Sequence, residues 1–175
     1  MKQGFVVWLT GLPGAGKTTI ARQLEIQLRK LDWPVEVLDG DEIRQNLSKG
    51  LGFSREDRET HLKRVTYVAK LLSRNGVAVI AAFISPYRSI RDHARKETTN
   101  FMEVFVKCSI EACSKRDPKG LYKKASMGAI KDLTGPQDLY EEPLTPDLVV
   151  DTEKLTLDDE VKVIMRKLQE LQLIN

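Results

Sequence analysis

The sequence predicts an α/β fold in which a doubly wound, parallel five-stranded sheet carries helices on both faces. Short runs rich in β-branched and aromatic residues alternate with helical periods through most of the 175 residues. These runs are largely apolar, as expected of strands that are buried on both faces and joined by helical crossovers. The first run leads directly into a glycine-rich turn, Gly11-x-x-x-x-Gly16-Lys17-Thr18, followed by a helical period. The length predicts a single domain spanning residues 1–175.

The strands are expected where β-branched or aromatic residues cluster over a few positions. In chain order these runs are 5–10, 34–39, 77–83, 101–107 and 147–150. In a sheet of this kind, ligands bind at the carboxyl ends of the strands, so the segments that follow these runs are the candidate site.

The helices are expected in the intervals, at 17–31, 41–48, 56–75, 87–98, 109–116 and 156–171. Ser54 followed by two acids is a start signal for the third of these helices, and Gly76 marks its end. Thr156 is a cap for the last helix, whose first turn is acidic and whose final turn carries Lys167, as the helix dipole favours.

A long stretch from Asp117 to Pro146 lacks a strong period and is rich in proline and glycine. Loops of this length in a compact domain are usually functional, so we interpret 117–146 as a mobile lid with a helical piece near 121–131. Residues 88–131 hold eleven Lys or Arg against five Asp or Glu. This local excess of positive charge suits a lid that closes over a phosphorylated ligand.

The overall composition indicates a soluble globular protein, with 41% hydrophobic and 30% charged residues and a net charge of +3. No apolar run is long enough to span a membrane, and we expect no signal or transit peptide ahead of the first strand. Cys108 and Cys113 show no metal-ligand spacing, which favours a reducing, cytoplasmic setting. Neither the net charge nor the motifs indicate a nucleic-acid partner.

The glycine-rich turn is a complete phosphate-binding loop in the context that supports it. Glycines without Cβ atoms let the loop direct successive backbone N–H groups at phosphate oxygens. Lys17 can reach the β- and γ-phosphates, and Thr18 can offer its hydroxyl to Mg²⁺. The expected cofactors are therefore ATP and Mg²⁺, and the expected ATP-binding residues are Gly11, Leu12, Pro13, Gly14, Ala15, Gly16, Lys17, Thr18 and Thr19.

Two carboxylates flank a glycine where the second strand ends, in Leu38-Asp39-Gly40-Asp41. We expect Asp41 to act on the proton of an acceptor hydroxyl and Asp39 to hold Mg²⁺, partly through water. The structural alternative is that Asp41 caps the next helix, and the two roles can coexist. The third strand has no acid at its end, so Asp39 and Asp41 carry more of the expected chemistry.

Three arginines follow on the next helices, where their planar guanidinium groups would suit phosphate or sulfate oxygens. Arg58 and Arg64 fall on nearly opposite sides of one helix, which favours Arg44 and Arg58 at the acceptor. After the third strand, Phe83-Ile84-Ser85-Pro86-Tyr87-Arg88 could face the cleft, although a turn that caps a helix is an equal alternative.

Several segments together resemble adenylylsulfate kinases (APS kinases), a family of phosphate-loop kinases. They are the phosphate loop, Leu38-Asp39-Gly40-Asp41, Leu51-Gly52-Phe53-Ser54, Phe83-Ile84-Ser85-Pro86-Tyr87-Arg88, Arg116-Asp117-Pro118-Lys119-Gly120-Leu121-Tyr122-Lys123-Lys124-Ala125 and Tyr140-Glu141-x-Pro143. The resemblance covers essentially the whole chain. It implies transfer of the ATP γ-phosphoryl group to the 3′-hydroxyl of adenosine 5′-phosphosulfate, usually by a homodimer. It also implies functional coupling to ATP sulfurylase, which makes that acceptor.

Carried over by position, the resemblance implies a catalytic role for Lys17 and Asp41. Ser85 stands where the family was once assigned a phosphoserine; we expect no such role, because direct transfer needs no covalent intermediate and no base is evident beside it. The implied substrate-binding residues are Asp39, Asp41, Arg44, Phe53, Arg58, His61, Phe83, Ile84, Ser85, Lys119, Gly120, Leu121, Lys123 and Leu133.

The chain departs from the family pattern at three positions. His61 replaces an asparagine that contacts the acceptor, and an imidazole can still make one hydrogen bond there. Leu133 replaces a phenylalanine that stacks on the acceptor adenine opposite Phe53, at an expected loss of about 1 kcal/mol. Leu139 replaces a proline. These departures keep a kinase for another small nucleotide or metabolite open as an alternative, whereas a non-catalytic binding module would be expected to have lost Lys17.

Overall fold

The computed structural model describes residues 3–175, in which five strands form one parallel sheet. The strands are β1 (Phe5–Thr10), β2 (Val35–Asp39), β3 (Ala78–Ala82), β4 (Phe101–Lys107) and β5 (Leu148–Asp151). Their order across the sheet is β2-β3-β1-β4-β5, so the chain winds to one side of β1 and then to the other. The expected doubly wound sheet is confirmed.

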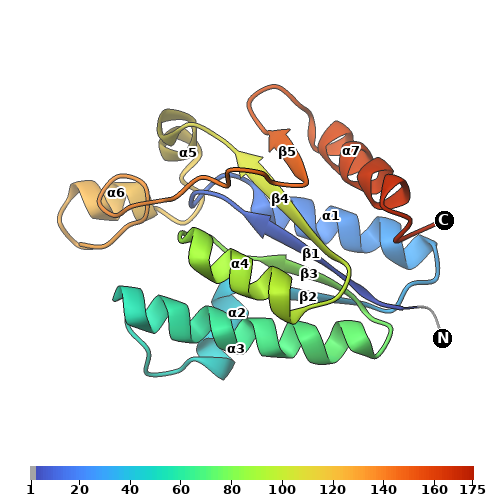
Figure 1. The fold of residues 1–175 in the computed structure, drawn as a ribbon. Helices are drawn as coiled ribbons and strands as arrows, with labels where there is room; N and C mark the ends of the chain where they lie inside the picture. The colour runs from blue at the N-terminus through green and yellow to red at the C-terminus, as the bar shows by residue number, and fades with distance from the viewer. Residues whose placement is uncertain (1–2) are drawn as a thin grey trace.

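Seven helices accompany this sheet in the described chain (Figure 1). They are α1 (Lys17–Lys30), α2 (Gly40–Leu47), α3 (Arg55–Arg74), α4 (Arg88–Glu97), α5 (Ile110–Arg116), α6 (Leu121–Ser126) and α7 (Leu157–Glu170). Strands and helices outside the 117–146 stretch lie within one residue of the expected bounds. The helical piece expected over 121–131 is shorter and ends at Ser126. It stops because Gly128 adopts a φ of 74°, a left-handed conformation that terminates helices.

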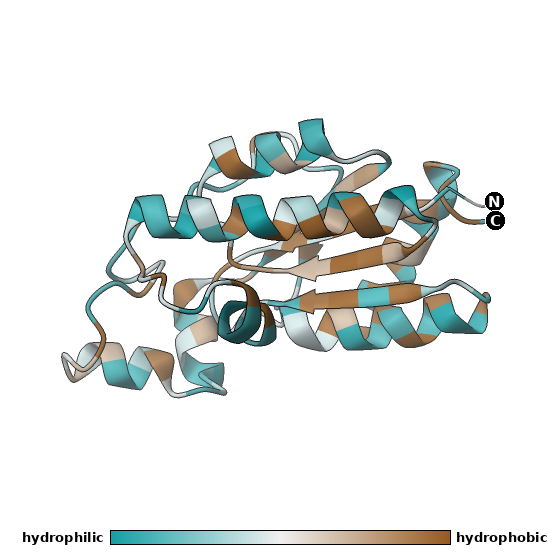
Figure 2. Cartoon of the chain, turned by 90° about the horizontal axis from the view of Figure 1, so that it is seen from below, coloured by the Kyte–Doolittle hydropathy of each residue, from teal (hydrophilic) through white to brown (hydrophobic). Residues whose placement is uncertain are grey.

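The sheet separates two hydrophobic cores, and β1 contributes to both. Phe5, Val7 and Leu9 point into the core that α1 and α7 cover, whereas Val6 and Trp8 point into the core beneath α3 and α4. All six residues of β1 are buried, which explains why this strand is apolar without alternation. In Figure 2 the strands are mostly hydrophobic, while the helices carry hydrophilic residues on their outer faces.

Side-chain caps fix where several of the helices begin. Ser54 accepts from Asp57 N at 3.1 Å and Thr156 accepts from Asp159 N at 3.3 Å, so both expected starts are confirmed. The cap of α2 is Asp39, whose carboxylate accepts from Asp41 N at 3.2 Å. The alternative in which Asp41 itself caps this helix is therefore wrong, because Asp39 is the cap and the helix begins at Gly40.

The carboxyl ends of the strands bring together segments that are far apart in the sequence. The phosphate loop follows β1, the Asp39–Asp41 turn follows β2, and residues 83–87 follow β3. No helix within residues 3–175 combines the length and apolar character needed to cross a membrane.

Candidate functional site

The phosphate loop joins the buried strand β1 to helix α1 and is shaped by its glycines. A Cβ atom on Gly11 would lie 2.4 Å from the carbonyl oxygen of Val106, so only glycine fits against β4. Gly16 has a φ of 105° and no heavy atom within 4 Å of where its Cβ would be. The loop therefore opens at the N-terminus of α1, where backbone N–H groups and the helix dipole favour an anion.

Lys17 is the cation at the centre of this loop. Its Nζ donates to the carbonyl oxygens of Gly11 at 2.8 Å and Leu12 at 2.7 Å. Burial lowers the pKa of Lys17 from 10.5 to about 8, with Lys119 adding to the effect. An ammonium group that is held only by carbonyl oxygens in a desolvated loop is poised to pair with phosphate.

The remaining loop residues have distinct environments. Ala15 is fully buried, Leu12 is half-buried and Thr19 is exposed. The carbonyl oxygen of Pro13 accepts a hydrogen bond from Tyr122 Oη at 2.8 Å, which ties the loop to helix α6. Sequence reasoning missed this role of Tyr122, although its motif was singled out, because a hydrogen bond between residues 109 positions apart leaves no periodic signal.

Two free, buried cysteines lie beneath the loop. The carbonyl oxygen of Cys113 would be 3.2 Å from a Cβ on Gly14, so the loop packs directly on helix α5. Burial raises the pKa of the Cys113 thiol to about 12, and Cys108 and Tyr122 both contact it. The Cys113 thiol is therefore a packing group in its protonated form.

Thr18 and Asp39 bring a hydroxyl and a carboxylate together beside the phosphate loop. Thr18 Oγ1 donates to Asp39 Oδ2 at 2.7 Å, and Asp39 Oδ1 caps α2. Asp39 is only 8% exposed. Both groups supply oxygen atoms, the ligand type that Mg²⁺ prefers. Their geometry is compatible with the prediction that Thr18 and Asp39 together bind the metal.

Asp41 lies at the start of α2 and forms an ion pair with Lys119. This contact ties Asp41, the carboxylate expected to act on the acceptor, to Lys119 of the lid. Gly120 then turns the chain with a φ of 64° into α6, and the backbone N–H of Lys123 donates to Asp117. The structure therefore brings Lys119 to Asp41, while the side chain of Lys123 is exposed and Leu121 is half-buried.

Arg44 and Phe53 form a second part of the site, next to the end of α2. Arg44 Nη1 donates to the carbonyl oxygens of Leu51 at 3.3 Å and Gly52 at 2.9 Å, and its guanidinium lies 4.4 Å from the ring centre of Phe53. Burial, and then the neighbouring Arg58, lower the pKa of Arg44. A guanidinium group whose pKa is lowered by a neighbouring positive charge marks a local excess of positive charge, which suits an anion.

Arg58 is 7% exposed and links helix α3 to the lid. Its Nε donates to the carbonyl oxygen of Phe53 at 2.7 Å, and its Nη2 donates to that of Asp132 at 2.7 Å. It also bonds Thr134 and lies 3.4 Å from the carboxylate of Asp138. The residue expected to grip the acceptor anion thus holds residues 132–138 of the lid in this structure. Arg64, the weaker sequence candidate, donates to Leu47 O and lies on an exposed part of the helix.

His61 is buried next to the end of β3. Its Nδ1 shares a hydrogen bond of 2.7 Å with Ser48 Oγ, and its ring meets Phe83 edge-on at 5.7 Å between centroids. Burial, followed by the positive charges of Arg44 and Arg64, lowers the pKa of His61 to about 4. The imidazole is therefore neutral at pH 7 and anchors the segment that follows α2.

The turn after β3 places Ser85 in an unusual conformation. Ser85 has a φ of 42° and is 2% exposed. Its Oγ accepts from Trp8 Nε1 at 3.0 Å and donates to Phe83 O at 3.3 Å, while Ile84 O accepts from Thr10 Oγ1 at 2.7 Å. This hydroxyl is buried and already makes two hydrogen bonds, which supports the expectation that Ser85 is not phosphorylated.

A pocket of about 560 Å³ lies between the start of α3 and the lid. Phe53 and Leu139, each 59% exposed, are apolar walls of this pocket, and Asp132 and Asp138 bring carboxylates to it. Leu133 does not line it, because that side chain is 6% exposed and packs in the core on the α1 side of the sheet. The remaining lining residues are Ser54, Arg55 and Tyr87.

Comparison with known proteins agrees with this arrangement. A family profile described as adenylylsulphate kinase matches residues 3–151. A probable adenylyl-sulfate kinase of Pseudomonas aeruginosa is 58% identical over 94% of this chain and 77% of its own length. The adenylyl-sulfate kinase of Rippkaea orientalis is 54% identical over 97% of this chain and 94% of its own length. Among solved structures, the APS kinase of Mycobacterium tuberculosis in complex with AMPPNP and APS has a TM-score of 0.93, with 38% identity over 97% of this chain and 99% of that chain.

Proposed function

This chain belongs to the adenylylsulfate kinase family, and from that premise we propose that it phosphorylates the 3′-hydroxyl of adenosine 5′-phosphosulfate (APS) with ATP. The product is 3′-phosphoadenosine 5′-phosphosulfate (PAPS). The observation that carries the proposal is the meeting of a phosphate loop, the Asp39–Asp41 turn and two buried or half-buried arginines at one edge of the sheet. A solved relative that binds AMPPNP and APS on the same fold supports it.

The nucleotide is held by the phosphate loop in this proposal. Backbone N–H groups of residues 11–16 surround the β- and γ-phosphates, and the positive end of α1 points at them. Lys17 gives up its contacts with the carbonyl oxygens of Gly11 and Leu12 and pairs with the γ-phosphate. The pairing restores the ammonium charge that burial disfavours.

Magnesium would be held by Thr18 and Asp39, whose oxygen atoms lie 2.7 Å apart. Their donor set fits the ion, because Mg²⁺ is usually bound through one or two protein oxygens, with phosphates and water as its other ligands. The ion supplies charge neutralisation for the transferring phosphoryl group.

In this proposal the acceptor is held across from the phosphate loop, between α2, α3 and the lid. Arg44 and Arg58 bind the phosphosulfate, and the base enters the 560 Å³ pocket beside Phe53. In the transfer, the bond between the γ-phosphorus and its bridging oxygen breaks as the 3′-oxygen bonds to phosphorus. The hydroxyl proton passes to Asp41, whose Oδ2 is engaged by Lys119, so the proton goes to Oδ1.

The decisive experiment measures PAPS formation by the purified chain with Mg·ATP and APS, with AMP and a panel of small alcohols as competing acceptors. We expect PAPS, with a clear preference for APS over AMP. ATP binding without any PAPS would contradict the proposal. Phosphorylation of another acceptor would favour the alternative function, a kinase for another small nucleotide or metabolite. The buried Leu133 and the neutral His61 are the two features that leave this alternative open.

We also propose that the chain works as a homodimer in the cytoplasm and in functional coupling with the enzyme that makes APS. An APS kinase from Thiobacillus denitrificans described as hexameric supports self-association, with 34% identity over 99% of this chain and 30% of that chain. A probable bifunctional SAT/APS kinase of Sorangium cellulosum, 55% identical, supports the coupling. Light scattering should give twice the 19.8 kDa mass of one chain, and a monomer would refute the dimer.

A further inference from the structure

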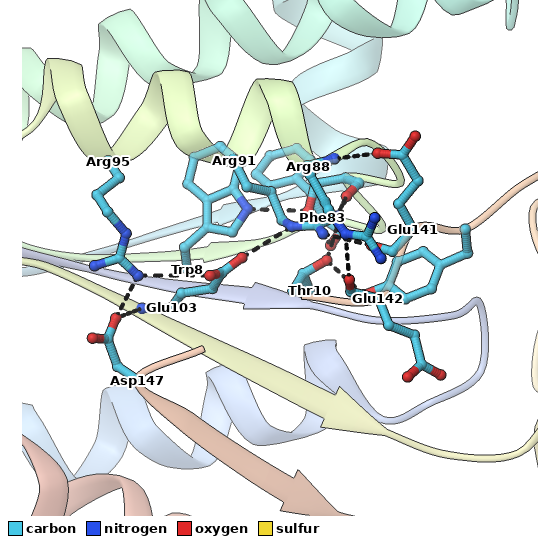
Figure 3. Close-up of polar contacts among 12 residues, drawn as sticks. Trp8, Thr10, Phe83, Arg88, Arg91, Arg95, Glu103, Glu141, Glu142 and Asp147 are labelled. Atoms are coloured by element: carbon cyan, nitrogen blue, oxygen red, sulfur yellow. Dashed lines mark hydrogen bonds and ion pairs between the residues drawn. The ribbon is translucent and has the colours of Figure 1, made fainter. Parts of the chain in front are cut away.

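Arg91 is a buried arginine on helix α4 that donates hydrogen bonds to three separate segments (Figure 3). Its Nε donates to Glu103 Oε1 on β4 at 2.9 Å, and the two carry opposite charges. Its two terminal nitrogens donate to backbone carbonyls, Nη1 to Ser85 O and Nη2 to Glu141 O. The side chain is 2% exposed. A guanidinium spreads its N–H donors over three nitrogens in one plane and so reaches partners on separate segments, whereas an ammonium group has its donors on a single nitrogen.

The first carbonyl belongs to residues 83–88, which we call the acceptor turn because its backbone is expected beside the acceptor. Ser85 holds a φ of 42° there, a conformation that a residue with a side chain adopts only when its surroundings impose it. Arg91 bonds the carbonyl of this residue, and Thr10 Oγ1 bonds the carbonyl before it at 2.7 Å. Thr10 directly precedes the phosphate loop.

The second carbonyl belongs to residues 140–142, which we call the strap because they close the lid segment onto the sheet. Glu141 N donates to Pro86 O at 2.8 Å, and Glu141 Oε2 accepts from Arg88 N at 2.7 Å. Arg88 Nε in turn donates to Glu142 O at 2.8 Å. The strap therefore lies directly against the acceptor turn, and Arg91 bonds both.

Tyr140 completes the link to the phosphate loop. Its hydroxyl is 2.9 Å from Thr10 Oγ1 and its ring stacks on Phe105. Thr10 has one hydroxyl proton and gives it to Ile84 O, so Tyr140 is the donor in this contact. Burial raises the pKa of Tyr140 to about 12, which keeps the hydroxyl protonated.

We infer that Arg91 is a positioning residue for the phosphoryl acceptor, with Tyr140 as its second anchor. By bonding the carbonyls of Ser85 and Glu141, Arg91 holds the acceptor turn and the strap at one spacing from Thr10 and the phosphate loop. At 2% exposure Arg91 acts through these protein groups and not by touching nucleotide or acceptor, and its role rests on the proposed function. A displacement of about 1 Å at a reacting centre can cost two orders of magnitude in rate, so such a frame matters to the transfer.

Arg91→Lys tests this inference because lysine keeps the charge opposite Glu103 but cannot reach both carbonyls. We expect the KM for APS to rise about tenfold or more, while the dissociation constant of a non-hydrolysable ATP analogue stays within about twofold. Hydrogen exchange of residues 83–88 and 140–142 should become faster. Arg95→Lys is the matched control, because Arg95 pairs with the same Glu103 and with Asp147 instead of bonding these carbonyls, and its KM for APS should be unchanged.

Tyr140→Phe is the second variant and removes only the hydroxyl that reaches Thr10. It should raise the KM for APS about threefold with little loss of thermal stability, which keeps the inference testable if Arg91→Lys does not fold. An unchanged KM for APS and unchanged exchange in the folded variants would overturn the inference. An equal loss of ATP binding would do the same, since it would mean a general structural role. If the wild-type chain makes no PAPS, the proposed function fails, and the exchange data still decide whether Arg91 holds the two segments.

Discussion

Thr18 donates its hydroxyl to Asp39 at 2.7 Å, which joins the first turn of α1 to the end of β2. Thr18→Val removes this hydroxyl with little change of shape, so the concentration of Mg²⁺ needed for half-maximal activity should rise about tenfold. Activity titrated with Mg²⁺ at fixed ATP checks this. Glu36→Gln, on the exposed side of the same strand, should leave the titration unchanged, and an unchanged titration in Thr18→Val would remove Thr18 from the proposed metal site.

Lys17 should make ATP binding weaken at alkaline pH. Its pKa in the empty protein is about 8, so above pH 8 the site increasingly holds a neutral amine, whereas phosphate binds the ammonium form. The dissociation constant of an ATP analogue should therefore be about tenfold higher at pH 9 than at pH 7, with proton uptake on binding. Calorimetry in two buffers measures both quantities. Lys17→Ala should abolish turnover and this pH dependence while remaining folded.

Asp41→Asn should lower kcat by about a hundredfold or more, because the amide cannot take the proton of the acceptor hydroxyl. The affinity for the ATP analogue should be retained, since the phosphate loop is untouched. Single-turnover kinetics and calorimetry separate the two effects. Glu42→Gln, the next carboxylate on the exposed face of α2, is the control and should retain its rate. If kcat changes little in Asp41→Asn, Asp41 is not the proton acceptor, and its role is limited to the ion pair with Lys119.

His61 should make the protein less stable in acid. The folded protein keeps the imidazole neutral down to a pKa of about 4, whereas the unfolded chain binds a proton near pH 6.5. Between these values the unfolded state binds more protons, so stability falls as the pH drops from 6.5 to 4. Melting temperatures across this range should fall less steeply for His61→Asn, and parallel curves for both proteins would contradict the assignment.

Leu133 and Leu139 should respond differently to substitution. Leu139→Ala shortens an exposed wall of the pocket that Phe53 also lines and should raise the KM for APS severalfold without loss of stability. Leu133→Phe inserts a larger ring into a packed core and should lower stability by about 1–3 kcal/mol while leaving the KM unchanged. A lower KM in Leu133→Phe would instead mean that this position stacks on the acceptor base.

The sequence predicts the sheet and its helices closely, because buried parallel strands and capped helices leave local signals. The phosphate loop, Asp39 and Asp41 are identifiable for the same reason, since each lies in a short motif at the end of a strand. The contacts of Arg91 and Tyr122 were not predictable, because a buried polar residue depends on partners up to 109 positions away. The direction in which Leu133 points depends likewise on the course of the lid and not on any local period.

The two cysteines beneath the phosphate loop make this chain suitable for site-directed spectroscopy. Cys108 and Cys113 are both buried, and the Cys113 thiol, with a pKa of about 12, reacts slowly with maleimides at neutral pH. Met127, which is 74% exposed just beyond α6, could be replaced by a single reactive cysteine without removing the native pair. A fluorophore attached there would report whether α6 moves when ATP and APS bind, in the otherwise unaltered protein.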